Sequence, residues 1–248
     1  MVHLAPLPGA PAFAGDLAAV LDAAVVDAAV IAAAGFDAVM VENFGDAPFY
    51  ADDVPKVTIA AMTRAVAAVG AETGLPVGVN VLRNDGLGAL AVAAATGASS
   101  IRINVVSGTM YTDQGPIVGK AAEIARTRRQ LAPDVQVFAD VFVKHATAPA
   151  GLTIEQATAD LAERGGADAI VVSGDATGLP PSMALLSKVH GTAAGTPLLI
   201  GSGTTPDNIA DFLTVAHGVI AGTAIKQSGL TTAPVDPARA RALVEAAG

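Results

Sequence analysis

The chain has 248 residues, of which 52% are hydrophobic and 4% aromatic, and its formal net charge is −9 at pH 7. An acidic protein repels nucleic-acid backbones and anionic lipid headgroups, so neither is an expected partner. The absence of cysteine excludes disulfides and thiolate catalysis, and it fits a reducing compartment. Uncharged stretches are interrupted by Gly, Thr and Ser, and no signal peptide is evident. We therefore expect a cytoplasmic protein without a membrane span.

Short runs rich in Val, Ile and Leu alternate along the chain with longer alanine-rich stretches. In chain order, strands are predicted at 1–4, 38–42, 77–82, 100–105, 135–142, 169–173, 198–200 and 218–221. Helices are predicted at 16–34, 55–73, 87–95, 116–131, 154–164, 181–192, 206–215 and 237–246. Gly35, Gly74, Gly97 and Gly165 follow helices, where a left-handed residue is favoured.

This alternation predicts an α/β fold, a single (β/α)8 TIM barrel formed by residues 1–248 as one domain. An open doubly wound sheet is the structural alternative. In a barrel the carboxyl ends of all strands meet at one mouth, where active sites lie. Polar residues at strand ends are therefore the candidates for function.

Polar residues occupy the predicted strand ends, although strands covered on both faces are normally apolar. Period-2 alternation places Arg102 and Asn104 on one face of their strand, opposite the isoleucines, and Asn80 faces the same way in its own strand. These side chains are expected to point into the barrel. Asp140 lies among apolar neighbours in the same way, and a simple buried ion pair with Arg102 explains both residues equally well. Substrate-binding roles are predicted for His3, Asn80, Arg83, Arg102, Asn104 and Ser173, and Asp175 lies at the same mouth.

Two glycine-containing loops follow the seventh and eighth predicted strands. Gly201, Ser202 and Gly203 end the seventh strand, and Gly222 and Thr223 end the eighth. In barrels these two loops often bind phosphate through backbone N–H groups. The pair predicts an anion site, and neither loop matches a P-loop or a Rossmann motif.

Glu42, Asp140, Lys144 and His145 are the candidates for catalysis. Lys144 and His145 are adjacent on a segment expected to be extended, so only one of them should face the pocket. A Schiff-base role for Lys144 would require its desolvation. Lys226 is expected either to contact the phosphate or to be solvated. No cofactor is predicted, and no metal motif occurs; Glu42 with Asp140 offers at most an oxygen-ligand site for Mg²⁺.

Seven segments together resemble the BtpA family, which also includes SgcQ-type proteins. They are VHLAPLPGAP, MVEN, GVNVLRND, IRINV, ADVFVKHA, GSGTTPDN and GVIAGTAIK, and they run from His3 to Lys226. The resemblance implies a TIM-barrel-like protein and one of two functions: handling of a nucleotide or sugar phosphate, as for SgcQ-type members, or a role in photosystem I biogenesis. Family members carry apolar residues before the first segment, so a truncated first strand is expected here.

We therefore predict an enzyme that binds a small phosphorylated metabolite, such as a sugar phosphate, and acts as a lyase, aldolase or isomerase. The glycine loops would hold the phosphate, and Asp140 or Glu42 would be the general base. Lys144 or His145 would stabilise developing negative charge. The alternative is a non-catalytic assembly factor, whose inward polar residues would form mutual ion pairs without an open pocket. The oligomeric state, including a homo-oligomer, is left open.

Overall fold

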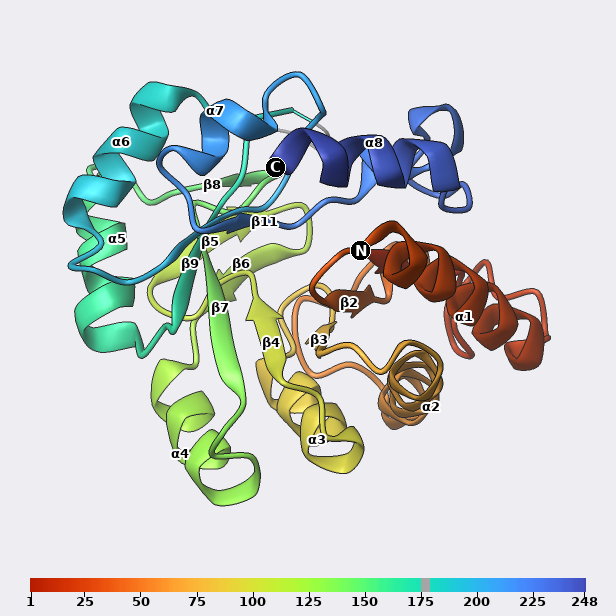
Figure 1. The fold of residues 1–248 in the computed structure, drawn as a ribbon. Coiled ribbons are helices and arrows are strands. Elements are labelled where there is room, and N and C mark those ends of the chain that lie inside the picture. The colour runs from red at the N-terminus through yellow and green to blue at the C-terminus, as the bar shows by residue number, and fades with distance from the viewer. Residues whose placement is uncertain (175–178) are drawn as a thin grey trace.

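The computed structural model describes residues 1–174 and 179–248. Eight parallel strands form the central sheet, in the order β1-β2-β3-β4-β7-β9-β10-β11, and the helices lie around its outside (Figure 1). The strands are β1 (Val2–His3), β2 (Val39–Glu42), β3 (Val77–Asn80), β4 (Ser100–Ile103), β7 (Gln136–Val141), β9 (Ala169–Val172), β10 (Leu198–Ile200) and β11 (Gly218–Val219). The helices are α1 (Leu17–Ala34), α2 (Lys56–Thr73), α3 (Gly86–Thr96), α4 (Ala121–Leu131), α5 (Ile154–Ala159), α6 (Met183–Thr192), α7 (Ile209–Leu213) and α8 (Pro237–Ala247). The predicted TIM-barrel class is confirmed, with strand ends that differ by a few residues.

The two end strands of the sheet, β1 and β11, lie at the seam of the barrel. Among the described residues no ladder pairs them, but the backbone nitrogen of Met1 donates to Ala221 O at 2.8 Å. On the outside, α8 packs beside α1, so the ring of helices continues across the seam. This brings the loop after β11 next to β1.

The core consists of branched aliphatic side chains from the strands and small side chains from the helices. Ala24 and Ala28 of α1 and Ala61 and Ala65 of α2 are buried against the strands, where alanine allows close approach. Helix α1 is also long and apolar enough to cross a membrane, with a mean hydropathy of 2.1, a test that core helices pass as well. In this structure it is a wall helix that contacts α2 and α8.

A three-stranded antiparallel sheet, in the order β6-β5-β8, was not predicted from the sequence. It consists of β5 (Thr109–Thr112), β6 (Gly115–Val118) and β8 (Ala146–Thr147). The predicted helix at 116–131 was therefore wrong in its first turn, and α4 begins at Ala121. Met110 and Ile117 are buried in a small second core, whereas Tyr111 and Val118 are exposed, which is the alternation of a strand pair.

Three of the four predicted left-handed glycines have positive φ, namely Gly35 (93°), Gly74 (62°) and Gly97 (73°). The fourth prediction, Gly165, was wrong by one position, because Gly166 has the positive φ of 72°. The reason is that α5 continues into a π-helical turn, Asp160–Gly165, which adds a residue before the chain reverses.

Candidate active site

A cavity of about 410 Å³ opens at the carboxyl ends of the strands. Predicted site residues that line it are His3, Glu42, Asn80, Arg83, Arg102, Asn104, Asp140, Lys144, His145, Gly201, Ser202, Gly203, Gly222 and Thr223. Ser173 lies behind Gly201 instead, and Asp175 falls outside the described residues. Phe44, Phe49, Thr231 and Arg239 also line the cavity. None of these four was predicted from the sequence, because they lie in loops or in α8 rather than at strand ends.

Four polar side chains lie at one level of the barrel because their strands are in matching register. His3 is the register partner of Glu42, Glu42 that of Asn80, and Asn80 that of Arg102. Register partners on parallel strands lie side by side and point to the same face. The predicted inward direction of Asn80 and Arg102 is therefore confirmed, and β1 to β4 carry a continuous polar row into the cavity.

Arg102 and Asp140 form a buried, two-pronged ion pair. Arg102 Nε donates to Asp140 Oδ1 at 2.8 Å, and Nη2 donates to Oδ2 at 2.9 Å; the residues are 5% and 4% exposed. Both carboxylate oxygens are thus engaged, which makes Asp140 a poor general base or magnesium ligand. Arg102 Nη2 also lies 3.1 Å from where a Cβ of Gly201 would stand, so the missing side chain at Gly201 leaves room for the guanidinium group.

Glu42 and His3 form a different kind of pair. His3 Nδ1 lies 3.1 Å from Thr231 O, and because a carbonyl only accepts, Nδ1 carries the proton. Burial lowers the pKa of His3 to about 3, and burial raises the pKa of the Glu42 carboxyl. His3 is therefore neutral at pH 7, and its Nε2 presents a lone pair to Glu42 Oε1 at 3.6 Å. Because His3 is neutral and 3.6 Å exceeds hydrogen-bond distance, the two side chains are neighbours rather than an ion pair.

We expect the variant His3→Gln to lose part of the pH dependence of stability. The pKa of His3 is lowered in the fold from 6.5 to about 3, so the unfolded chain binds a proton first as the pH falls. The stability that neutral His3 contributes to the fold is present above pH 6.5 and is lost as the pH falls from 6.5 towards 3. In the wild type, His3 should lower the free energy of unfolding by about 2 kcal/mol between pH 8 and pH 5, and His3→Gln should lack this loss. Urea unfolding of wild type and variant at the two pH values measures this difference. An equal drop in unfolding free energy in both proteins would contradict the lowered pKa of His3.

The loop after β10 uses part of its predicted anion-binding groups for its own structure. The Gly201 amide donates to Val172 O at 2.7 Å and extends the sheet. The Ser202 hydroxyl accepts from the Gly174 amide at 3.3 Å and donates to Leu179 O at 3.1 Å. Gly201 and Ser202 therefore shape the loop, and the donors left for a ligand come from the residues that follow.

Unused donors lie at Gly203 and Thr204 and in the loop after β11. Gly203 has a φ of 73°, and a Cβ there would lie 2.2 Å from Pro180 N, so only glycine fits. Thr204 is 3% exposed, and its hydroxyl has no hydrogen-bond partner among the described residues. Among the described residues, the amides of Gly203, Thr204, Gly222 and Thr223 have no hydrogen-bond acceptor. Small residues and free amides at one end of a cavity are suited to an anion.

Thr231 and Arg239 complete the side of the cavity near β11. The hydroxyls of Thr223 and Thr231 lie 2.9 Å apart. Arg239 Nε donates to Ala224 O at 2.9 Å, which holds this exposed guanidinium group from α8 at the rim. The segment between β11 and α8 therefore adds a cation and a hydroxyl pair to the glycine loops.

Lys226 has neither of the two environments expected from the sequence. It is 1% exposed, and its Nζ donates to Asp27 Oδ2 of α1 at 2.6 Å. The other oxygen of Asp27 accepts from the Val235 amide at 2.7 Å. Lys226 and Asp27 thus fasten the loop after β11 to the helix wall, and Lys226 is not a ligand-binding residue.

Lys144 and His145 both line the cavity, so the expectation that only one would do so was wrong. The segment is a turn rather than an extended strand, with positive φ at Phe142 (50°) and His145 (55°). Burial lowers the pKa of Lys144, as does the nearby Arg102. The lysine is half-buried, so its amine is partly desolvated.

Two further buried polar groups at the site are left without partners in the described parts of the chain. Asn80 Nδ2 donates to Arg102 O at 3.1 Å, but Asn80 Oδ1 has no donor. Arg83 is 8% exposed; its Nη2 donates to Lys144 O, and its Nε has no acceptor. Buried groups of this kind mark places where a ligand supplies the missing bonds.

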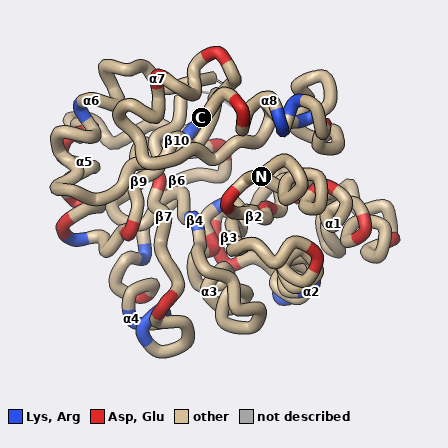
Figure 2. Tube along the Cα trace, viewed as in Figure 1, with Lys and Arg blue, Asp and Glu red and all other residues tan. Residues whose placement is uncertain are grey.

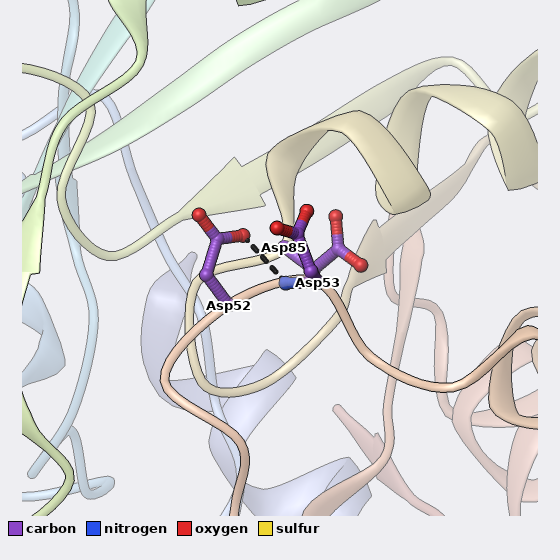
Figure 3. Close-up of side chains that lie close together, drawn as sticks. All are labelled: Asp52, Asp53 and Asp85. Carbon is purple, nitrogen blue, oxygen red and sulfur yellow. Dashed lines mark hydrogen bonds between the residues drawn. The ribbon is translucent and has the colours of Figure 1, made fainter.

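An acidic cluster outside the cavity joins the loops after β2 and β3. Carboxylate oxygens of Asp52, Asp53 and Asp85 lie within 4.8 Å of one another (Figure 3). Lys120 Nζ lies 2.5 Å from Asp52 and 3.4 Å from Asp53, and Asp85 accepts from two backbone amides, one of them at the start of α3. Because an amine and two amides already face these carboxylates, the cluster is a clamp between loops.

Comparison with known proteins gives a consistent family and fold. A model of the BtpA family matches residues 1–248. An uncharacterized protein of Thermococcus kodakarensis is 49% identical, covering 100% of this chain and 93% of its own length. The photosystem I biogenesis protein BtpA of Synechocystis is 45% identical over 99% of this chain and 86% of its own length. The putative sgc region protein SgcQ of Escherichia coli is 30% identical over 99% of this chain and 91% of its own length.

Among solved structures, orotidine 5′-phosphate decarboxylase from Pyrococcus horikoshii has a similar fold. The TM-score is 0.62 at 14% identity, and the match covers 92% of this chain and 94% of the enzyme. At this identity the likeness concerns the fold alone.

Proposed function

The chain belongs to the BtpA family, and we propose that it is an enzyme that binds a small phosphorylated metabolite, such as a sugar phosphate, in the cavity at its strand ends. The observation that carries the proposal is a group of three buried polar atoms on cavity-lining residues that have no partner among the described residues: Thr204 Oγ1, Asn80 Oδ1 and Arg83 Nε. Leaving such a group unpaired costs about 1–3 kcal/mol. A polar ligand in the cavity would offset that cost.

The phosphate would lie against the amides of Gly203, Thr204, Gly222 and Thr223, which have no acceptor in the described parts of the chain, with Arg239 at the rim. These donors come from the two loops that bind phosphate in many barrels, which supports this orientation of the ligand. The rest of the metabolite would then reach toward the polar row on β1 to β4. We place the activity in the cytoplasm, in line with the acidic, cysteine-free composition.

Glu42 is the better candidate for the general base, because both oxygens of Asp140 are occupied by Arg102. In lyase, aldolase and isomerase reactions a base removes a proton and negative charge develops on an oxygen of the substrate. Glu42 would take the proton, with the His3 lone pair beside it, and Arg102, held by Asp140, would face the developing charge. Asp140 is then a positioning residue.

A non-catalytic assembly factor is the second candidate, because one relative is named a photosystem I biogenesis protein. The buried Arg102–Asp140 pair is a feature expected of such a protein. The open cavity and its unpaired donors favour the enzyme, since a scaffold gains nothing from leaving buried polar atoms without partners.

The variant Thr204→Val tests the phosphate site. Wild-type protein should be stabilised by ribose 5-phosphate in a concentration-dependent way, because a ligand that prefers the folded state raises the melting temperature. The variant should bind ribose 5-phosphate roughly tenfold more weakly, since a hydrogen bond to a charged group is lost. Its stability without ligand should be unchanged or higher, because the hydroxyl it loses has no partner among the described residues. Calorimetric titration and thermal unfolding measure the two effects.

Thr232→Val is the matched control, since Thr232 is exposed and does not line the cavity. It should bind as the wild type does. Replacement of Gly203 is a poor test, because any Cβ there would collide with the backbone at Pro180. If neither inorganic phosphate nor ribose 5-phosphate stabilises the wild type at millimolar concentration, the proposed phosphate site is wrong.

A further inference from the structure

We infer that the cavity has a second anion subsite, formed by Arg83 and Lys144, which takes a carboxylate at the other end of the same ligand. The substrate class is then a phosphorylated acid rather than a neutral phosphorylated sugar. The inference rests on the proposed phosphate site, but Arg83 and Lys144 belong neither to the Arg102–Asp140 ion pair nor to the glycine loops.

Arg83 is the first observation. It follows β3, is 8% exposed, and forms no ion pair among the described residues. One terminal nitrogen donates to Lys144 O, which fixes the guanidinium group, while its Nε has no acceptor in the described chain. Arginine is almost never this buried without a partner. A group that is charged, fixed and short of an acceptor is a built anion site.

The charge balance of the cavity is the second observation. Away from the glycine loops, where Arg239 lies at the rim, its wall carries Arg83, Arg102 and Lys144 as cations and Glu42 and Asp140 as carboxylates. The bond between Arg102 and Asp140 cancels one charge of each sign, which leaves two cations against one carboxylate. The protein as a whole has a net charge of −9, with acidic residues spread over its outer helices and loops (Figure 2). A positive cavity inside an acidic protein selects an anionic ligand.

The surplus of one positive charge favours a carboxylate over a second phosphate. A carboxylate brings a single negative charge at pH 7, whereas a phosphate monoester brings nearly two. Guanidinium and ammonium groups together also match the planar pair of carboxylate oxygens. Burial lowers the pKa of Lys144, and an arriving carboxylate would favour its charged form again.

The positions of the two subsites in the barrel set the shape of the ligand. Arg83 and Lys144 follow β3 and β7, which flank β4, whereas the glycine loops follow β10 and β11. In the order of eight strands, β10 and β11 lie on the opposite side of the ring from β3 and β4. A ligand that reaches both subsites must cross the mouth. A cavity of about 410 Å³ is adequate for a small acid with phosphate and carboxylate at opposite ends.

The test compares two ligands that differ only at the end away from the phosphate. 6-Phosphogluconate carries a carboxylate where glucitol 6-phosphate carries a hydroxymethyl group, and 3-phosphoglycerate with glycerol 3-phosphate forms a shorter pair. Calorimetry on the wild type should show the acid of at least one pair binding tenfold or more tightly than its partner alcohol. Arg83→Gln and Lys144→Gln should each reduce that ratio several-fold and leave the alcohol phosphate unchanged. Thr204→Val should weaken both members of a pair equally.

The outcomes separate the two proposals. If acid and alcohol phosphates bind equally well in both pairs, the carboxylate subsite is wrong and the phosphate site stands. If no ligand of either pair binds although ribose 5-phosphate does, the carboxylate subsite is wrong; if inorganic phosphate and ribose 5-phosphate fail as well, both proposals are wrong. Two variants are used so that one of them still decides the matter if the other does not give a cooperative thermal transition. Covalent trapping of pyruvate on Lys144 by borohydride would overturn the inference, because that lysine would then form an imine instead of binding a carboxylate.

Discussion

Replacing Asp27 by alanine should lower the free energy of unfolding by about 3–5 kcal/mol, the cost of leaving one partner of a buried ion pair alone. Lys226 is 1% exposed and donates to Asp27 at 2.6 Å, and the same carboxylate accepts from the Val235 amide at 2.7 Å. Without Asp27, an ammonium group and an amide would remain buried without an acceptor. The loop after β11, which lines the cavity, should loosen at the same time.

Urea unfolding at pH 7 measures the loss. The double variant Asp27→Leu with Lys226→Met should recover most of it, because well-packed apolar residues often replace a buried ion pair at little cost. Asp22→Ala, on the exposed face of the same helix, is the matched control and should change stability by less than about 0.5 kcal/mol. A loss below about 1 kcal/mol for Asp27→Ala would mean that Lys226 finds water or another partner.

Asp140→Ala and Glu42→Gln should have opposite effects on stability, although both residues are buried acids at the same cavity. Removing Asp140 leaves Arg102, which is 5% exposed, without its two-pronged partner, and the expected cost is about 3–5 kcal/mol. Glu42 has a raised pKa, caused mainly by burial, so its environment disfavours the carboxylate. A neutral amide at this position should keep or increase stability at pH 8.

The direction of the stability change in Glu42→Gln follows from the raised pKa of the Glu42 carboxyl. The unfolded chain ionises first as the pH rises through 4.5, so Glu42 lowers wild-type stability at higher pH. The difference between Glu42→Gln and wild type should therefore grow from pH 4 to pH 8 in urea titrations. Equal destabilisation by both variants would show that Glu42 is a structural residue, and the proposal that it is the general base would have to be withdrawn.

Much of the candidate site could be predicted because of where parallel strands end. Polar residues inside runs such as 77–82 and 100–105 break the apolar pattern of a covered sheet, and Asn80 and Arg102 do line the cavity. Arg239 and Thr231 could not be found in this way, because they reach the cavity from a loop and a helix. The hairpin of β5 and β6 was missed because Pro116 resembles a helix start, and only pairing with the facing strand decides otherwise.

The repeat of strands and helices, the TIM-barrel class and the mouth at which the polar residues gather could all be predicted, since each of these follows from local periodicity. Which charges are paired and which are left for a ligand became clear only from the packing of the folded chain. Lys226 and Asp27 are 199 residues apart in the chain yet share a hydrogen bond, whereas Arg83 lies near the carboxylates of the cavity without bonding to either. Pairing depends on distances of a few ångströms between side chains from remote elements, and local patterns do not encode such distances.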